Sequence, residues 1–373
     1  MRIGIDISLL SINLSGVGVY IREMLKYFSE MDSENAYFLY SNRPINNEYV
    51  FPKKTTLRVV EKKTHLFWQI ICLPGLIKQD RLDIYWEPNH CIPIMPKGPR
   101  YVVTVHDLAA IVCPQYAAKG TVIINKLFLR HTCKKADRII AISEYTKKDI
   151  YRILNINNDK VSVIYNGDSL YDEHTFYDEH EKCEVLNKYN LDNYFLYVGN
   201  VHPRKNIITI IRAYEDYCTR EADSYKLLIA GSFSWNTKEI EKIINTSSVK
   251  DKIIITGYVN DIELKYFYKN AKALVFPSRY EGFGLPILEA MSVGTIVITS
   301  KATSLPEVAG NAALYLNDLD NSKELSKIYS EVQHMDAVDK DRLIRNGYVQ
   351  KSKFSRRKCA CKILELFQVV YNE

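Results

Sequence analysis

The stretch from Ala271 to Ala290 constrains the fold of this chain more than any other, because a strand, a glycine turn and a helix follow one another without a break. The run Ala271-Lys-Ala-Leu-Val-Phe276 is short and apolar, which is typical of a strand that is buried on both faces. Two glycines, Gly282 and Gly284, allow a sharp turn and a close approach of backbone amides to a ligand. Pro286 suits the first turn of a helix, where a missing amide hydrogen costs nothing. These features predict an α/β protein that binds a ligand at a strand end.

Two carboxylates frame this turn, Glu281 at its start and Glu289 in the helix that follows. A carboxylate accepts hydrogen bonds from two hydroxyl groups, which suits polyols such as a sugar or a ribose. Backbone amides at a helix N-terminus favour a phosphate or an electron-rich sugar oxygen. The turn residues that we expect to bind such a ligand are Gly282, Phe283, Gly284 and Leu285.

The motif Pro277-Ser-Arg-Tyr-Glu-Gly-Phe-Gly-Leu-Pro-Ile-Leu-Glu-Ala290 resembles the long form of the Glu-x7-Glu signature of retaining GT-B glycosyltransferases, often called glycosyltransferase family 4 or group 1. A bare pair of glutamates at this spacing is common by chance, whereas the long form is specific. The resemblance implies two Rossmann-like, doubly wound parallel-sheet domains that face an interdomain cleft. It also implies that Glu281 positions the donor sugar and that Glu289 binds the ribose.

A second motif, Arg204-Lys205, follows the strand-like run Tyr194–Val198 and precedes a helical pattern. Two cations beside a helix start suit a diphosphate. Taken alone, the pair is equally typical of a solvated basic turn. In the resembled family an Arg-Lys pair upstream of Glu-x7-Glu clamps the donor diphosphate, so the resemblance implies that Arg204 and Lys205 stabilise the leaving group.

His106 and Asp107 follow the expected strand Arg100–Val105. Strands that alternate with helices predict a parallel sheet, in which ligands bind beyond the carboxyl ends of the strands. The family has a histidine at this strand end that meets the donor sugar, which implies a catalytic-site role for His106. A histidine that only stabilises the fold is the alternative.

Four further residues join the expected donor site. The glycine turn at 13–20 lacks Gly-x-Gly-x-x-Gly, so a dehydrogenase is not indicated, and a simple tight turn is an open alternative. In the family this loop closes over the donor, and the loops after two later strands wrap the nucleotide base. The residues concerned are Gly16, Val17, Tyr258 and Val259.

The length of 373 residues predicts two domains. We expect an N-terminal domain at 1–167, a linker at 168–190 and a nucleotide-sugar domain at 191–354, with the C-terminal helix 355–373 packed back on the first domain. Ser143 and Asp261 are expected to cap helices. No apolar run approaches the length that spans a bilayer, and the eight cysteines are scattered, so a cytoplasmic protein is expected.

Charge is unevenly distributed, since residues 1–165 hold 23 Lys/Arg and 15 Asp/Glu. This excess favours an anionic partner, such as the inner membrane face or a phosphorylated acceptor, although a basic surface that only aids solubility is an alternative. The aromatic-rich run 64–78 fits either lipid contact or core packing. No nucleic-acid motif is present.

We expect no metal and no cofactor. The near-repeat Tyr171-Asp-Glu-His174 and Tyr177-Asp-Glu-His180 has the residue types of a metal site, but a charged stretch of this kind is typical of a solvated loop. The Asp-x-Asp at Asp318-Leu-Asp320 is expected at the surface.

The resemblance implies transfer of a hexose from a nucleotide sugar to a glycan, with retention of anomeric configuration. Likeness to bacterial mannosyltransferases favours GDP-mannose, while a UDP- or dTDP-sugar remains open. The acceptor is expected to be lipid-linked, as in surface polysaccharide synthesis. A non-catalytic subunit of the same fold, or another GT-B enzyme such as a nucleotide-sugar epimerase, is the alternative.

Overall fold

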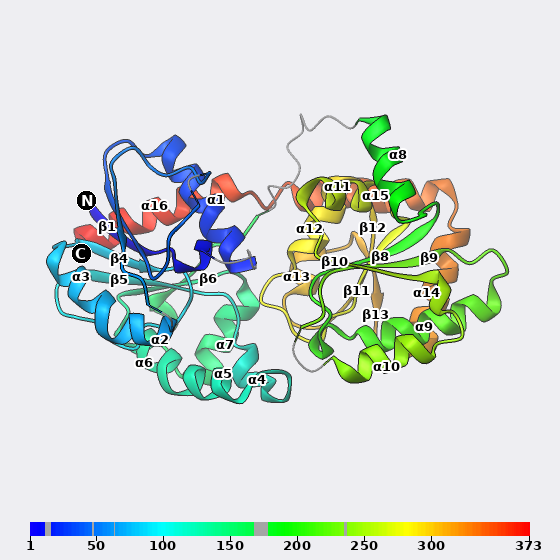
Figure 1. Ribbon diagram of the computed structural model, residues 1–373, viewed down its shortest axis with the longest axis horizontal. Coiled ribbons are helices and arrows are strands. Elements are labelled where there is room, and N and C mark those ends of the chain that lie inside the picture. The colour runs from blue at the N-terminus through cyan, green and yellow to red at the C-terminus, as the bar shows by residue number, and fades with distance from the viewer. Residues whose placement is uncertain (12–15, 47, 63, 168–177, 235–236) are drawn as a thin grey trace. The chain divides into compact units, whose positions relative to one another are not determined.

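The computed structural model describes residues 1–11, 16–46, 48–62, 64–167, 178–234 and 237–373 (Figure 1). The chain forms two compact units, which we describe separately. The first unit comprises Met1–Gly167 together with Ser355–Glu373, and the second comprises Asp168–Phe354. The last helix of the chain therefore belongs to the first unit.

The first unit is built on a seven-stranded sheet with the order β3-β2-β1-β4-β5-β6-β7, and every neighbouring pair is parallel. Because the order reverses between β1 and β4, this pair is the topological switch point of the sheet. The strands are β1 (Arg2–Asp6), β2 (Ala36–Ser41), β3 (Thr55–Val59), β4 (Ile84–Glu87), β5 (Arg100–Val105), β6 (Arg138–Ala141) and β7 (Val161–Val163).

Helices cover both faces of this sheet, and β2 shows how its side chains divide. Tyr37 and Leu39 join the core beneath α1 and α16, whereas Phe38 and Tyr40 join the core beneath α3, α6 and α7. This alternation follows from the two-residue period of a strand. The helices of this unit are α1 (Gly16–Met31), α2 (His65–Phe67), α3 (Leu73–Gln79), α4 (Ala109–Val112), α5 (Lys119–Ile124), α6 (Arg130–Lys135), α7 (Glu144–Leu154) and α16 (Arg356–Asn372).

The point where the chain leaves and re-enters the first unit is closely packed. Arg356, which is buried, donates from Nε to the carbonyl oxygen of Gly167 at 2.8 Å, and its Nη1 lies 3.4 Å from Oε2 of Glu23 on α1. A Cβ on Gly167 would lie 2.3 Å from the backbone nitrogen of Arg356, so only glycine fits there. The start of α16 is thus bonded to the end of the first chain segment.

The second unit repeats the doubly wound arrangement in a six-stranded parallel sheet with the order β10-β9-β8-β11-β12-β13. Its switch point lies between β8 and β11. The strands are β8 (Tyr194–Val198), β9 (Lys226–Ala230), β10 (Ile253–Gly257), β11 (Ala273–Phe276), β12 (Ile296–Ser300) and β13 (Ala313–Leu316). The helices are α8 (Glu179–Lys188), α9 (Ile207–Arg220), α10 (Lys238–Thr246), α11 (Asp261–Asn270), α12 (Leu285–Ser292), α13 (Leu305–Ala309), α14 (Ser322–His334) and α15 (Ala337–Lys351).

The structure differs from the linker expected at 168–190. Residues 168–177 lie outside the described residues, but α8 occupies most of the remainder and packs against α11. Lys188 forms an ion pair with Glu263 at 2.6 Å, and the hydroxyl of Tyr266 donates to Glu181 at 2.6 Å. These partners lie some 75 to 85 residues away in the sequence. The polar local sequence of α8 therefore gave no indication that the helix packs against α11. Among the described helices, none is both long enough and apolar enough to cross a bilayer.

Candidate functional site

The polar residues expected to bind the donor meet at the switch point of the second sheet. Arg204 and Lys205 follow β8, and Glu281 follows β11, so all three lie at the carboxyl edge of the two central strands. Parallel pairing of β8 with β11 brings these loops together, although 76 residues of chain separate Lys205 from Glu281. This edge is where doubly wound sheets bind ligands.

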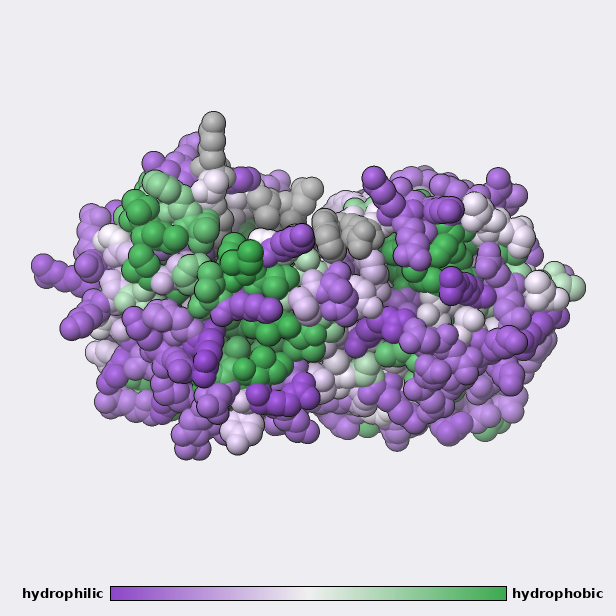
Figure 2. All heavy atoms as spheres, turned by 90° about the horizontal axis from the view of Figure 1, so that it is seen from below, coloured by the Kyte–Doolittle hydropathy of each residue, from purple (hydrophilic) through white to green (hydrophobic). Residues whose placement is uncertain are grey.

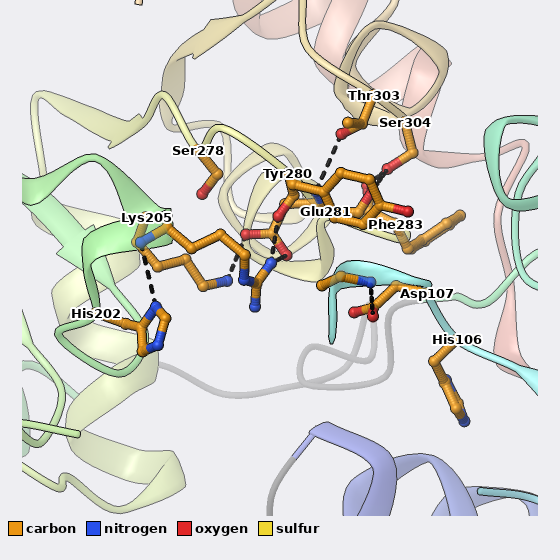
Figure 3. A network of polar contacts seen from close by, with 12 residues as sticks. His106, Asp107, His202, Lys205, Ser278, Tyr280, Glu281, Phe283, Thr303 and Ser304 are labelled. Carbon is orange, nitrogen blue, oxygen red and sulfur yellow. Dashed lines mark hydrogen bonds and ion pairs between the residues drawn. The ribbon is translucent and has the colours of Figure 1, made fainter. Parts of the chain in front are cut away.

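Glu281 is held between the two cations (Figure 3). Nζ of Lys205 donates to Oε1 of Glu281 at 2.5 Å, and Nη1 of Arg204 lies 3.4 Å from Oε2. The Arg204 guanidinium also donates to the carbonyl oxygen of Tyr280, which fixes it beside the loop after β11. The three side chains carry a net charge of +1 in a largely buried place. That charge suits an anion such as a diphosphate.

Burial alone would raise the pKa of Glu281, but the charges of Lys205 and then Arg204 outweigh it and hold this pKa below its usual value. The carboxylate is therefore ionised at neutral pH. An ionised carboxylate accepts hydrogen bonds and does not donate them, so Glu281 can bind hydroxyl groups rather than act as an acid.

The turn that contains the paired glycines is fixed by the loop after β12. Thr303 accepts the backbone N–H of Glu281 at 3.0 Å, and the Ser304 hydroxyl lies within 3.0 Å of the carbonyl oxygens of both Glu281 and Phe283 (Figure 3). Thr303 has φ 53°, which is rare for a β-branched residue. Gly284 has φ 113° just before α12, a conformation that favours glycine. Strain of this kind is common at binding sites.

Glu289 lies one helical turn into α12 and is buried. The hydroxyl of Tyr268 on α11 donates to its Oε2 at 2.6 Å, so the carboxylate is oriented by a neighbouring helix. Gly282, Phe283, Gly284 and Leu285 connect the two glutamates, and all but Leu285 are buried. The structure therefore groups these residues with Arg204 and Lys205 at one edge of the second unit.

Tyr258 and Val259 follow β10, the edge strand of the same sheet. Tyr258 is 74% exposed, and its base-binding role stays a prediction. Closer to the centre, Gly231 after β9 touches the loop after β8, because a Cβ there would lie 2.0 Å from the carbonyl oxygen of Gly199. The backbones of these loops meet without side chains between them.

In the first unit, His106 lies at the end of β5 against the N-terminal half of α1. Its Nε2 lies 2.8 Å from the carbonyl oxygen of Pro88, and its ring meets the Tyr20 ring edge-on at 5.1 Å. Burial and then the neighbouring His90 lower the pKa of His106 to about 4, so it is neutral at physiological pH. Asp107 accepts the N–H of Ala109 at 2.9 Å at the start of α4, which gives that carboxylate a structural role.

Gly16 and Val17 are the first two residues of α1, while residues 12–15 of the same loop lie outside the described residues. Gly16 is exposed, and an added Cβ would meet no atom within 4 Å. Their contact with a donor stays a prediction.

Three polar residues near the switch point of the first sheet were not indicated by sequence reasoning. Asp6 ends β1 and Glu87 ends β4; the pKa of Glu87 is raised well above its usual range by burial and then by the charge of Asp6. His90 has φ 40°, and its buried Nδ1 has no hydrogen-bond partner among the described residues. The strand-end rule that indicated His106 also applies to Asp6 and Glu87.

No group of three or more metal-ligating side chains occurs within the part of the chain that the structure describes. The near-repeat at 171–180 lies mostly outside that part. Asp318 and Asp320 are exposed, and Asp320 forms an ion pair with Arg279.

Both units match known glycosyltransferase families. Residues 14–168 match the family described as Glycosyltransferase Family 4, and residues 178–350 match the one described as Glycosyl transferases group 1. Among solved structures, sucrose-phosphate synthase from Thermosynechococcus elongatus aligns with a TM-score of 0.79 at 17% identity, covering 100% of this chain and 99% of that one. Anabaena HepE in complex with UDP-glucose aligns with a TM-score of 0.75 at 15% identity, covering 99% and 100%. The fold is therefore GT-B, and the class of protein is a nucleotide-sugar glycosyltransferase.

Curated relatives agree with this class. The O-antigen chain mannosyltransferase B of Escherichia coli is 32% identical over 77% of this chain and 74% of its own length. The O-antigen chain mannosyltransferase RfbU of Salmonella typhimurium is 29% identical over 82% of this chain and 79% of its own length. The chain belongs to glycosyltransferase family 4, group 1. Its activity is hexosyl transfer. This replaces the two alternatives from the sequence, a non-catalytic subunit and an epimerase.

Proposed function

We propose that the chain transfers mannose from GDP-mannose to a lipid-linked glycan during bacterial surface polysaccharide synthesis, with retention of anomeric configuration. The carrying observation is the group of Arg204, Lys205 and Glu281 at the switch point of the second sheet. The choice of mannose is supported by the two relatives at 32% and 29% identity, which are named as mannosyltransferases.

The chemistry follows from the charges of this group. Departure of a nucleoside diphosphate places negative charge on the leaving oxygen, and preorganised cations stabilise it, which is usually the largest catalytic contribution. Arg204 and Lys205 supply two such cations without a metal. Glu281 is ionised and binds hydroxyl groups of the donor sugar, while Glu289 binds the ribose.

His106 is the residue of the first unit that contributes to the proposed site. Because its pKa is about 4, the ring is neutral, and it can form a hydrogen bond with a sugar hydroxyl or with the carbonyl oxygen of Pro88 without adding charge. No side chain is assigned as general base. To retain the configuration, the acceptor hydroxyl attacks the donor sugar on the same face from which the diphosphate departs. The departing phosphate oxygen takes the proton of that hydroxyl. We place the reaction at the cytoplasmic face of the inner membrane.

A binding panel tests the donor site. GDP, UDP, dTDP, ADP and CMP are compared by calorimetry and thermal unfolding in buffer with EDTA. A ligand present at about a hundredfold over its Kd adds about 2.7 kcal/mol to the free energy of unfolding. We expect GDP to bind, Lys205→Ala to lose that binding, and Lys301→Ala to keep it, since exposed Lys301 follows β12 on the same sheet but bonds Asn317.

Transfer itself is then measured with GDP-mannose and UDP-glucose on a lipid-linked oligosaccharide, and the anomeric configuration of the product is read by NMR. The HepE structure is a complex with UDP-glucose, which makes UDP the informative competitor. Binding of UDP in place of GDP would show that the donor is a UDP-sugar. Binding of none of the five nucleotides would refute the donor site.

A further inference from the structure

Several large apolar side chains of the first unit are exposed on helices that carry none of the expected site residues. Val112 ends α4, and the others occur on the helical segment of α2 and α3 and on that of α5 and α6; these two segments contain the π-helical turns Trp68–Cys72 and Asn125–Leu129 respectively. The exposed fraction of these side chains ranges from 36% to 63%. We call this set the apolar face: Leu66, Phe67, Ile71, Val112, Ile123 and Leu127.

The two segments lie on the same face of the sheet. Trp68 and Leu129, at their inner sides, belong to one core cluster, so their exposed sides point away from the sheet together. A single loop joins them: Gln69 donates to the carbonyl of Cys91, and Thr132 exchanges hydrogen bonds with the backbone of Ile92 at 3.0 Å. Figure 2 shows hydrophobic side chains gathered on this part of the first unit, with hydrophilic ones at the border. Groupings of this kind mark a binding surface.

Spacing along the segments supports one continuous stripe on each. Phe67 and Ile71 are four residues apart, as are Ile123 and Leu127, and such pairs lie on one side of a helix. The opposite sides carry the buried residues. Single exposed apolar residues are common on protein surfaces, but each of these stripes contains more than one.

Within the two helical segments the charged side chains are all basic. Residues 108–136 contain five Lys/Arg and no Asp or Glu, and residues 62–79 contain three Lys and again no acid. The basic side chains of the first stretch are all exposed: Lys119, Lys126, Arg130, Lys134 and Lys135. Five of the basic residues of 1–165 thus lie in the stretch of chain that contains Val112, Ile123 and Leu127.

We propose that this apolar face and its lysines dock the enzyme on an anionic lipid surface. Apolar side chains enter the boundary between headgroups and acyl chains, while lysines and arginines bind anionic headgroups, and the two contributions add. A second copy of the chain would bring two strongly basic surfaces together and be repelled. The proposal deepens the proposed function, because a lipid-linked acceptor lies at such a surface, but the test below does not require transfer.

The full-length protein is sedimented with vesicles of phosphatidylcholine alone and with vesicles that also contain phosphatidylglycerol. We expect binding to the anionic vesicles only, and weaker binding as salt rises, because salt screens exposed charges. Ile123→Ser with Leu127→Ser lowers the partition coefficient by about tenfold or more, and Lys134→Glu with Lys135→Glu does so most at low salt.

Matched controls come from the second unit. Val338→Ser with Val349→Ser removes two equally exposed apolar side chains, and Lys323→Glu with Lys327→Glu reverses two exposed lysines on α14; both leave vesicle binding unchanged. Circular dichroism and thermal unfolding confirm that every variant is folded.

Absence of binding to anionic vesicles, or equal losses in the controls and the surface variants, would overturn the proposal. So would a concentration-dependent dimer that the surface variants abolish, since that outcome assigns the face to a second copy. If the protein binds a nucleotide but no vesicles, the docking surface alone is refuted. If it binds anionic vesicles but none of the nucleotides, the proposed function alone is refuted.

Discussion

Nζ of Lys205 lies 2.5 Å from Oε1 of Glu281, across the two central strands of the second sheet. The other oxygen of the same carboxylate lies 3.4 Å from Arg204. One carboxylate therefore offsets part of the charge of two cations at the place where the donor diphosphate is proposed to bind. This pairing gives Glu281 opposite effects on two measurable quantities.

Glu281→Gln should tighten the binding of a free nucleoside diphosphate while it lowers transfer. The variant raises the net charge of the group from +1 to +2, which we expect to improve diphosphate affinity by about threefold to tenfold, or about 1 kcal/mol. Loss of the carboxylate that is proposed to bind the donor sugar should reduce kcat by about a hundredfold. Calorimetry and initial rates measure the two effects, with exposed Glu331→Gln as the control. A fall in both quantities would contradict this account.

Tyr268→Phe should weaken nucleotide binding although Tyr268 is only a positioning residue. Its hydroxyl orients buried Glu289 at 2.6 Å, and removal of one such hydrogen bond costs about 1 kcal/mol, or about fivefold in Kd. Tyr194→Phe is the matched control, because its buried hydroxyl donates at 2.9 Å to the carbonyl of Phe267, away from Glu289. Equal changes of Kd in the two variants would exclude orientation of Glu289 as the cause.

The stability of the protein should depend on pH through His106. Its pKa is about 4 in the folded chain and about 6.5 when unfolded, so the unfolded chain binds the extra proton between these values. This contribution is present in full above about pH 6.5 and is lost as the pH falls towards 4. Relative to His106→Gln, the wild type should lose about 2 kcal/mol between pH 7.5 and pH 5.

Urea unfolding at the two pH values measures this loss, and the difference between proteins cancels the titration of other groups. Exposed His131→Gln should track the wild type at both values. A gap between His106→Gln and the wild type that does not change with pH would show that the ring is not titrating as described.

Arg356→Met should destabilise the first unit strongly. The buried guanidinium donates to the carbonyl oxygen of Gly167 and pairs with Oε2 of Glu23, whose Oε1 also pairs with Arg22 at 2.9 Å. Loss of the charged donor from these buried oxygens costs about 1–3 kcal/mol, while Arg22 still offsets the charge of Glu23. The next residue provides the control, since Arg357 is 63% exposed and pairs with Glu30 at the surface, where such pairs contribute about 0–1 kcal/mol. Chemical denaturation of both variants compares them; a similar loss for each would contradict the buried role.

Much of the fold was open to prediction because strands and turns leave local patterns. The apolar runs at Ala273–Phe276 and Arg100–Val105 are strands, and Ser143 caps α7 by accepting the N–H of Thr146. The cap expected at Asp261 was wrong: Asn260 accepts the N–H of Glu263 at 2.8 Å, and Glu263 accepts the N–H of Asn260 in return. An Asn-x-x-Glu pattern marks that capping box, so the signal was present in the sequence.

Other parts of the site carry no local signal. Tyr268 reads as one of many aromatic residues, and nothing near Thr303 indicates that it adopts a left-handed conformation and accepts the N–H of Glu281. Their roles depend on α11 and on the loop after β12, which reach the site only when the sheet has assembled. The apolar face is similar, because residue 67 and residue 123 lie on one surface only after both helices pack on the same core.

The residues that carry the chemistry, the doubly wound class and the family signature were determined by the sequence itself, since glycine turns, strand ends and charged pairs act within a few residues. Only the tertiary structure decided which of these residues meet. Parallel pairing of β8 with β11 sets Lys205 against Glu281, and burial against two cations then keeps that carboxylate ionised. Contacts between residues far apart in the chain depend on strand order, and strand order leaves no mark on the local sequence.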